Sequence, residues 1–262
     1  MKTEKVTDHI VQWLKDYALN ANINGFVIGI SGGIDSAVTS TLCARTGLPL
    51  LCLEMPIHQA ENQVTRALKH IEWLKEHYDG VSMESVNLTP VFDSLVNAFP
   101  GVEKEEDRFM TLANTRARLR MTTLYYFAAL RGYLVAGTGN KVEDFGVGFY
   151  TKYGDGGVDL SPIADLLKTE VYEIAEHLGI IEEIRTAAPT DGLWGDNRTD
   201  EDQIGATYPE LEWAMKMDEE GKKPEDLEGR PREVLEIYRR LNRANKHKMV
   251  PIPVCEIPAE LK

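Results

Sequence analysis

The chain has 262 residues, of which 43% are hydrophobic and 27% charged, and its formal net charge is −13. A chain of this size and apolar content can bury a sizeable core, and we expect a single domain over residues 1–262. The acidic balance argues against nucleic-acid binding, which needs a basic surface, so a polyanionic ligand would require a local cluster of lysine, arginine and metal.

Cysteine usage and the N-terminal segment indicate where the protein works. Cys43, Cys52 and Cys255 are odd in number and form no Cys-x-x-Cys pair, which argues against a disulfide framework or a zinc knuckle. The N-terminal segment has apolar residues at helical spacing and no signal-peptide architecture, and no apolar run is long enough to span a bilayer. We therefore predict a cytoplasmic protein without membrane contact.

The most informative segment follows the first predicted strand, residues 26–30. It reads Gly29, Ile30, Ser31, Gly32, Gly33, Ile34, Asp35 and Ser36, and we expect a helix over about 35–46 after it. A strand that enters a helix through a glycine-rich turn directs backbone N–H groups and the positive helix end towards one point, which is an anion site. Gly32 and Gly33 are expected to adopt positive φ. The spacing matches neither a Walker loop nor a dinucleotide fingerprint.

Strands and helices continue to alternate through the first half of the chain. The patterns predict strands at 48–55, 81–88 and 133–137, and helices at 59–78, from Thr89 onwards and at 107–132. This order is typical of a Rossmann-like parallel sheet with helices on both faces. Ligands of such sheets lie beyond the carboxyl ends of the strands, where we expect the loops 29–36, 56–62 and 137–143 to gather.

The second half of the chain loses this alternation. Residues 145–157 predict a glycine-rich loop, and helices are predicted at 165–178, 208–216 and 231–245, before an extended end. Residues 186–205 are polar and aperiodic. A stretch of that length inside a compact domain is usually disordered or functional, and we interpret it as a lid that excludes water.

Several motifs resemble those of one enzyme family. Ser31-Gly-Gly-Ile-Asp-Ser36 resembles the pyrophosphate loop of the N-type ATP pyrophosphatases, which cleave ATP between its α and β phosphates. Further stretches narrow the resemblance, namely Arg116–Met121, Gly137–Asp144, Phe149–Leu160, Pro189–Trp194, Thr199–Gly205 and His247-Lys248. Together they look like the ammonia-dependent NAD synthetases over nearly the whole chain.

The resemblance implies a fold of the adenine nucleotide alpha hydrolase type and a two-step ligase reaction. ATP would adenylate the nicotinate carboxylate of deamido-NAD, and ammonia would then displace AMP to give NAD. The resemblance places ATP on residues 29–36, Thr138, Lys168 and Thr190, and Mg²⁺ on Asp35 and Glu143. Two carboxylates from separate strand ends suit a Mg²⁺ ion that bridges phosphates. The sequence alone also allows Glu143 as an acid at a helix N-terminus and Lys168 as a solvated helix residue.

The same resemblance places deamido-NAD on Arg118, Lys152, Asp159, His247 and Lys248. The catalytic residue is unknown, although Asp159 is a candidate to accept the proton of ammonium. Arg116 and Arg120 are left unassigned, because three arginines this closely spaced cannot all face one way on a helix.

Further expectations concern assembly and nitrogen supply. The resemblance implies a homodimer, and the apolar side of the 107–132 helix is compatible with a dimer contact, although its own sheet would bury it equally well. We expect no glutaminase domain in the chain, so free ammonia is the expected nitrogen source unless a separate partner delivers it.

Two alternatives stay open at this point. A sister ATP pyrophosphatase that modifies tRNA or forms GMP would share the loop, although a tRNA enzyme would want a basic face or cysteines for sulfur transfer. A non-catalytic nucleotide-binding module could keep the glycines but would not need Asp35 together with Glu143 and Lys168. Metal-dependent release of pyrophosphate would distinguish a catalyst from a binding module.

Overall fold

The computed structural model describes residues 1–59, 61–104, 108–189 and 199–262. It contains a parallel sheet of β1 (Phe26–Gly29), β2 (Leu50–Glu54), β3 (Val81–Ser85) and β4 (Leu134–Val135), in the order β3-β2-β1-β4. The register pairs Gly29 with Leu53 and Val27 with Val135. The parallel α/β architecture predicted from the sequence is thereby confirmed.

The fourth strand is shorter than the predicted 133–137 segment. β4 has only two residues, because the chain beyond it stops pairing with β1 and pairs with Leu160 instead. Ala136 forms an isolated parallel bridge with Leu160, and the Gly137 N–H donates to the Leu160 carbonyl oxygen at 2.8 Å. A hydrogen-bonding partner that lies more than twenty residues ahead in the chain is invisible to a local pattern.

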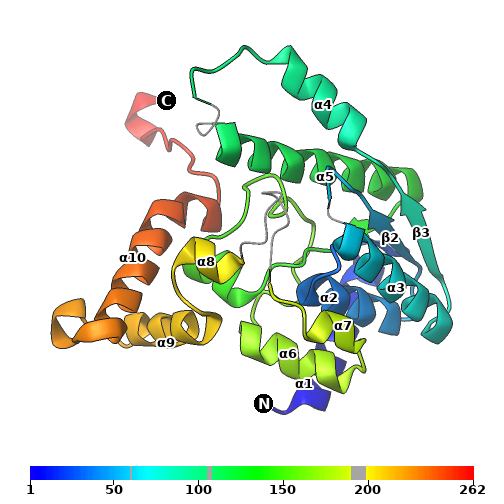
Figure 1. Ribbon diagram of the computed structural model, residues 1–262, viewed down its shortest axis with the longest axis horizontal. Helices are drawn as coiled ribbons and strands as arrows, with labels where there is room; N and C mark the ends of the chain where they lie inside the picture. Colours follow the sequence, from blue (N-terminus) through cyan, green and yellow to red (C-terminus); the bar gives the residue numbers. More distant parts are fainter. Residues whose placement is uncertain (60, 105–107, 190–198) are drawn as a thin grey trace.

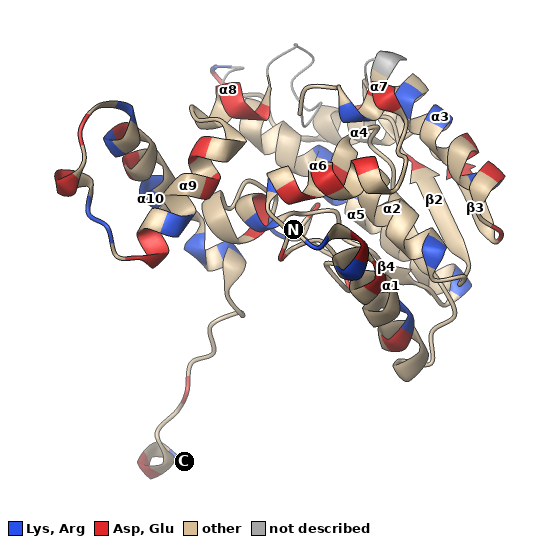
Figure 2. Cartoon of the chain, turned by 90° about the horizontal axis from the view of Figure 1, so that it is seen from below, with Lys and Arg blue, Asp and Glu red and all other residues tan. Residues whose placement is uncertain are grey.

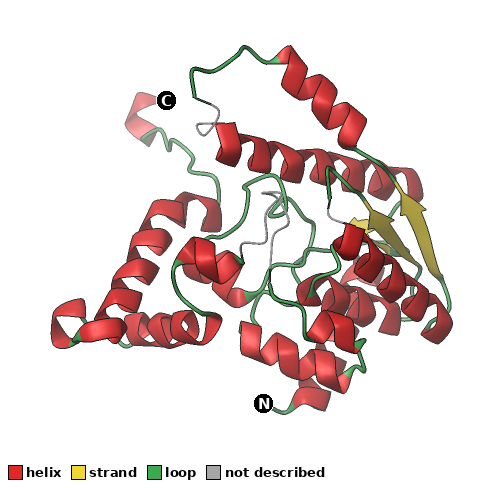
Figure 3. Ribbon diagram, in the orientation of Figure 1, coloured by secondary structure: helices red, strands yellow, loops and turns green. Residues whose placement is uncertain are grey.

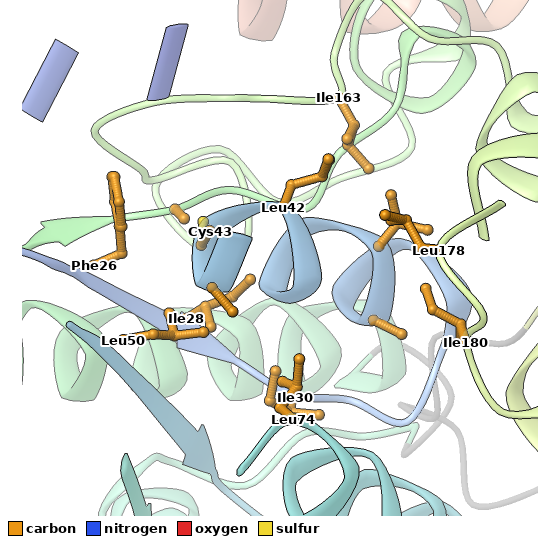
Figure 4. Packing of buried hydrophobic residues seen from close by; sticks show 14 of the residues in the cluster. Phe26, Ile28, Ile30, Leu42, Cys43, Leu50, Leu74, Ile163, Leu178 and Ile180 are labelled. Carbon is orange, nitrogen blue, oxygen red and sulfur yellow. The ribbon is translucent and has the colours of Figure 1, made fainter. Parts of the chain in front are cut away.

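Helices cover both faces of the sheet. One layer contains α1 (Thr3–Asn20), α2 (Ile34–Arg45), α3 (Glu61–His77), α6 (Lys168–His177) and α7 (Glu182–Arg185), and the other contains α4 (Thr89–Ala98) and α5 (Phe109–Arg131). Phe26 and Ile28 point into the first layer and Val27 into the second, as the alternation of a strand requires. Figure 4 shows Phe26 and Ile28 close to Leu42 and Cys43 of α2.

The helix that follows the glycine-rich turn is buried on nearly every side. Ten of the twelve residues of α2 are buried, including Leu42. Full burial of an aliphatic side chain of this kind contributes about 2 kcal/mol to the free energy of unfolding. The turn at the N-terminus of α2 is therefore anchored to the most deeply packed helix of the molecule.

A separate helical region lies on the opposite side of the molecule from the sheet (Figure 1). It consists of a π-helix, η2 (Val142–Val147), and the helices α8 (Asp200–Ile204), α9 (Tyr208–Glu219) and α10 (Gly229–Met249). Val142, Tyr208, Leu211 and Leu235 belong to its own hydrophobic core. Figure 3 shows loops running between this region and the sheet.

Two loop predictions need correction in this region. Residues 145–147 of the predicted glycine-rich loop belong to η2, and residues 200–204 of the predicted aperiodic stretch form α8. The Asp202 N–H donates to the Thr199 Oγ1 atom at 3.1 Å and so caps α8. A five-residue helix is too short to show a period and is recognisable only by such a cap. Residues 190–198, where the centre of the predicted lid falls, lie outside the described residues.

The C-terminal residues after α10 extend away from the body of the molecule, as Figure 2 shows. Residues 250–262 are exposed, and Val254 and Leu261 reach exposed fractions of 81% and 75%. In the described part of the chain, no helix combines the length and the apolar character that a membrane crossing requires.

Candidate active site

The glycine-rich turn between β1 and α2 is shaped by its own hydroxyl groups. The Gly33 N–H donates to Ser31 Oγ at 3.2 Å, and Ser36 Oγ donates to the Gly33 carbonyl oxygen at 2.9 Å. The two serine Oγ atoms lie 3.1 Å apart. These bonds hold the loop in one conformation before any ligand arrives.

Glycine is required at one position of this turn. Gly32 has a φ of +81°, and a Cβ atom there would lie 2.7 Å from the Gln63 carbonyl oxygen of α3. Gly33 has a φ of −96° and is the N-cap of α2, so the prediction of a positive φ was wrong for this residue. The side chains of Ile30 and Ile34 belong to the hydrophobic core, which leaves only their backbone groups to face a ligand.

A buried ion cluster lies beside this turn. The Lys168 Nζ atom lies 2.5 Å from Asp35 Oδ2 and 3.1 Å from Glu143 Oε1. The Lys168 side chain is 3% exposed, so the alternative of a solvated helix residue is wrong. Its burial acts to lower the pKa of Lys168, but the charges of Asp35 and Glu143 outweigh it and hold that pKa above its ordinary value. The lysine therefore stays charged at physiological pH.

Two residues that the sequence did not single out complete this cluster. Asn140 Nδ2 donates to Asp35 Oδ1 at 3.1 Å, while Asn140 Oδ1 accepts the N–H groups of Val142 and Glu143, each at 3.1 Å. Tyr208, from α9, donates its hydroxyl to Glu143 Oε1 at 2.6 Å, and its ring lies 4.6 Å from Lys168 Nζ. Asn140 followed Thr138-Gly139 in a motif already noticed, whereas no local signal marked Tyr208.

A cavity of about 290 Å³ opens beside the cluster. The predicted residues Gly29, Ile30, Ser31, Asp35, Ser36, Thr138 and Glu143 all contribute to its lining. Acids outnumber cations in its described lining, which also contains Glu54, Asp144, Asp155 and Asp200 and, as its one cation, Arg120. Such a lining repels a triphosphate unless a metal ion accompanies it.

The predicted dinucleotide residues form a second group, mostly around the end of α10. Lys152 Nζ donates to the His247 carbonyl oxygen at 2.7 Å, and Arg118 Nη2 donates to the Lys152 carbonyl oxygen at 3.3 Å. Lys248 Nζ donates to the carbonyl oxygens of Gly148 and Tyr150 at 2.6 and 2.7 Å. The structure thus brings four of the five predicted residues together.

This second group adjoins a second cavity of about 170 Å³, which Lys248 lines. The two cavities share the lining residues Gly137, Gly139, Asp144, Tyr150, Asp155 and Val158. Burial, together with the charge of Glu143, raises the pKa of Asp144 to about 7. The two cavities therefore adjoin, and the carboxyl group of Asp144, which gains or loses its proton near neutral pH, lies in the wall that they share.

Asp159, the fifth predicted dinucleotide residue, lies apart from that group. Its carboxylate accepts the Tyr125 hydroxyl at 2.9 Å and the Val135 N–H at 2.8 Å, and it is absent from the described lining of both cavities. These contacts tie residue 159 to β4 and α5. Thr190 lies outside the described residues.

Comparison with known proteins gives consistent matches. Residues 6–251 match the family model described as NAD synthase. An NH(3)-dependent NAD(+) synthetase from Carboxydothermus hydrogenoformans is 37% identical over 251 residues, which cover 94% of each chain. One from Methanosarcina mazei is 36% identical over 267 residues, covering 98% of this chain and 100% of the relative.

Two solved structures of synthetases resemble this chain over nearly its whole length. The NMN synthetase from Francisella tularensis superposes with a TM-score of 0.82 at 31% identity, over 99% of both chains. The NH3-dependent NAD synthetase from Campylobacter jejuni superposes with a TM-score of 0.78 at 25% identity, over 98% of this chain and 100% of the other.

Proposed function

The chain belongs to the NAD synthase family, and from this premise we propose that it amidates the nicotinate carboxylate of deamido-NAD with ammonia and ATP. The observation that carries the proposal is the Lys168 ammonium, held 2.5 Å from Asp35 and 3.1 Å from Glu143 beside the glycine-rich turn. A simple binding module has no use for a buried cation clamped between two carboxylates.

In the first step, the nicotinate carboxylate attacks the α-phosphorus of ATP, an acyl–phosphate bond forms and pyrophosphate leaves. The loop Gly29–Ser36 binds the phosphates through its backbone N–H groups and hydroxyls, and Thr138 extends that contact. Lys168 offsets negative charge that develops on the phosphate oxygens, because transfer of this kind depends on positioning and electrostatic stabilisation. We assign Thr190 to the same ATP site from the family resemblance.

The carboxylates of Asp35 and Glu143 fit a Mg²⁺ ion. Their oxygens converge on a single ammonium group, and carboxylate oxygens are the protein ligands this ion prefers. Among the described residues, no group of three or more histidine, cysteine, aspartate and glutamate side chains could hold a metal, so phosphate and water oxygens would complete the coordination. A bound Mg²⁺ ion would neutralise phosphate charge and assist the departure of pyrophosphate.

In the second step, ammonia attacks the carbonyl carbon of the adenylate and AMP leaves, which gives the amide of NAD. Ammonia must arrive neutral, so a carboxylate that accepts a proton from ammonium is needed. Asp159 is our candidate for this role from the family resemblance alone, and to act it would have to leave its contacts with Tyr125 and the Val135 N–H, because it is not among the described lining residues of either cavity. The adenylate is prone to hydrolysis, which is why the site must exclude water during this step.

We assign the dinucleotide to the space around the end of α10, with Arg118, Lys152, His247 and Lys248 as its contacts. Side chains in this group already donate to backbone carbonyl oxygens, so their donors are oriented before the ligand binds. A substrate that reaches from the glycine-rich turn to Lys248 would occupy both cavities.

We further propose that the protein acts as a homodimer, as one domain, in the cytoplasm. Helix α5 exposes four large apolar side chains, Phe109 and Met110 near its start and Tyr126 and Leu130 near its end, by 52% to 64%, and exposed apolar side chains of this size are compatible with an interface. Cytoplasmic ATP and reduced cysteines suit a chain whose three cysteines are free thiols. Sedimentation analysis would test the dimer.

A second candidate substrate comes from one solved relative. The structure named NMN synthetase has a TM-score of 0.82 to this chain, which raises nicotinate mononucleotide as the acid that is amidated. Both substrates carry the same nicotinate carboxylate, so the chemistry of the two steps is unchanged and only the far end of the ligand differs.

Coupled product assays test the proposal. Purified protein is incubated with ATP, Mg²⁺ and ammonium, and with either deamido-NAD or nicotinate mononucleotide, and the amide, AMP and pyrophosphate are quantified. We expect NAD, AMP and pyrophosphate in equal amounts from deamido-NAD. A higher kcat/KM for the mononucleotide would establish the second candidate, and pyrophosphate release with neither acid would refute both. A reaction given glutamine in place of ammonium checks the nitrogen source.

A further inference from the structure

One buried acid in the larger cavity has no part in the proposed mechanism. Glu54 is the last residue of β2, is 5% exposed and lines the cavity together with Ser31 and Asp35. The Ile30 N–H donates to the Leu53 carbonyl oxygen at 2.9 Å, which places Glu54 directly beside the start of the glycine-rich turn. The wall of the cavity therefore contains a carboxylate at the end of β2, the strand next to the one that leads into the glycine-rich turn.

The hydrogen bonding of Glu54 is incomplete. Ser85 Oγ donates to Glu54 Oε2 at 2.6 Å, while Glu54 Oε1 has no hydrogen-bond or ion-pair partner within the described ranges. Because Glu54 lines the cavity, this second oxygen is the one left for a ligand. Burying a carboxylate with a single hydroxyl partner is unfavourable, so a structural role in holding Ser85 does not account for an acid here.

We propose that Glu54 binds a ribose hydroxyl of the ATP substrate and thereby selects ribonucleotides. A carboxylate only accepts hydrogen bonds, so it cannot bind phosphate oxygens, whereas the ribose diol offers two donors close to the phosphates. In dinucleotide-binding folds, whose glycine spacing this chain does not share, an acid about 20 residues after the glycine-rich turn binds a ribose hydroxyl from the end of the neighbouring strand. Glu54 stands in the corresponding place, at the carboxyl end of the neighbouring strand. The assignment rests on the proposed use of ATP.

The test compares ATP with 2′-deoxy-ATP and 3′-deoxy-ATP in the wild-type protein and in Glu54→Ala. We expect kcat/KM of the wild type to fall at least about tenfold for one of the deoxynucleotides, because the deoxy sugar leaves a buried acceptor unpaired. Glu54→Ala lowers kcat/KM for ATP by a similar factor and makes ribo- and deoxynucleotide equal. The ratio of kcat/KM between ATP and a deoxynucleotide does not change when a variant is merely less stable, because loss of folded protein lowers both values equally.

Two further variants keep the test decisive. Glu54→Gln has nearly the same shape and is used if Glu54→Ala fails to fold; it replaces a charge-assisted hydrogen bond by a weaker neutral one, so the ratio should fall severalfold. Glu84→Ala is the matched control, because Glu84 lies on β3 but is exposed and paired with Arg131 at 3.7 Å. It should keep the wild-type ratio.

Several outcomes would overturn the assignment. Unchanged discrimination against both deoxynucleotides in Glu54→Gln or Glu54→Ala would do so. A variant that instead loses discrimination against purine riboside triphosphate, which lacks the adenine amino group, would assign Glu54 to the base. Titration calorimetry with α,β-methylene-ATP and its deoxy forms separates this inference from the proposed function, since it measures nucleotide binding even if no NAD is formed.

Discussion

The two halves of the site differ in how the chain constructs them. The phosphate half consists of a strand end, a turn and a helix that are consecutive in sequence, and α2 anchors it in the main core. The other half comes from η2, α9 and α10, which have a core of their own. Lys168, at the start of α6, joins the halves through Glu143 and Tyr208, which lie 25 and 40 residues from it in the sequence. In the proposed function, phosphate binding would therefore be a local property of the chain, whereas alignment of the two substrates would depend on the contact between two cores.

Removing the cation of the cluster should have the largest effect. Lys168→Met leaves Asp35 and Glu143 facing each other without their shared ammonium and removes charge stabilisation from the transferred phosphate. We expect kcat for NAD formation to fall about a thousandfold or more, measured as AMP release at saturating substrates. Lys69→Met, which breaks an exposed pair with Glu183, is the control and should retain full activity. A Lys168→Met rate within tenfold of the wild type would contradict the assigned role.

A buried histidine in the core on the phosphate side should make folding stability pH-dependent. His70 is fully buried, its Nε2 lies 2.9 Å from Ser40 Oγ, and burial lowers its pKa from 6.5 to about 4. The unfolded chain then binds more protons than the folded chain between these values, so stability is complete above pH 6.5 and decreases as the pH falls towards 4. From pH 7.5 to 4.5, this group should cost about 2.5 kcal/mol of unfolding free energy.

Urea titrations of the wild type and of His70→Gln at these two pH values measure the effect. The wild type should lose about 2.5 kcal/mol more than the variant on acidification, whatever the variant loses at neutral pH. His9→Gln, at an exposed position of α1, is the control and should lose as much unfolding free energy as the wild type between the two pH values. Equal acid losses in the wild type and His70→Gln would show that His70 does not titrate as a buried neutral group.

The carboxylate of Glu143, which meets Lys168 of the main core, can lose one hydrogen bond by the removal of a single oxygen atom. Tyr208→Phe removes the hydroxyl that donates to Glu143 at 2.6 Å but keeps the ring in its core. We expect kcat to fall about tenfold, because the hydrogen bond to a charged group contributes about 1.5 kcal/mol or more, while KM for ATP changes little. Tyr17→Phe, at an exposed site on α1, controls for loss of a tyrosine hydroxyl. A Tyr208→Phe variant that raises KM for ATP and leaves kcat unchanged would place Tyr208 in phosphate binding instead.

A change confined to the second half should have the smallest effect. Lys152→Ala removes an exposed cation that donates to the His247 carbonyl oxygen. We expect KM for the dinucleotide to rise about fivefold, as for loss of a solvent-accessible charged contact, with KM for ATP within experimental error. Initial rates measured against each substrate in turn decide this, and equal increases in both KM values would refute the division of the site.

The sequence predicted the strand, turn and helix of the first half well and the structure of the second half incompletely, for physical reasons. Ser31, Asp35 and Ser36 lie on one turn whose geometry follows from its neighbours in sequence. The burial of Lys168 was not predictable, because its position at the start of α6 resembles that of a solvated residue until Asp35 and Glu143 are seen on either side of it. Tyr208 contacts a residue 65 positions away, and α8 is too short to have a period. Long-range contacts of this kind leave no local pattern.

The exposed C-terminal segment provides a way to observe the molecule directly. Cys43 and Cys52 are buried, and burial raises the pKa of Cys43 strongly and that of Cys52 to about 12, so neither forms the reactive thiolate readily. Cys255 lies on the exposed segment, six residues beyond the end of α10. A maleimide fluorophore would therefore attach at this one position in the native protein. Its emission would report whether the end of the chain changes its surroundings as substrates bind near Lys248, without a single substitution in the sequence.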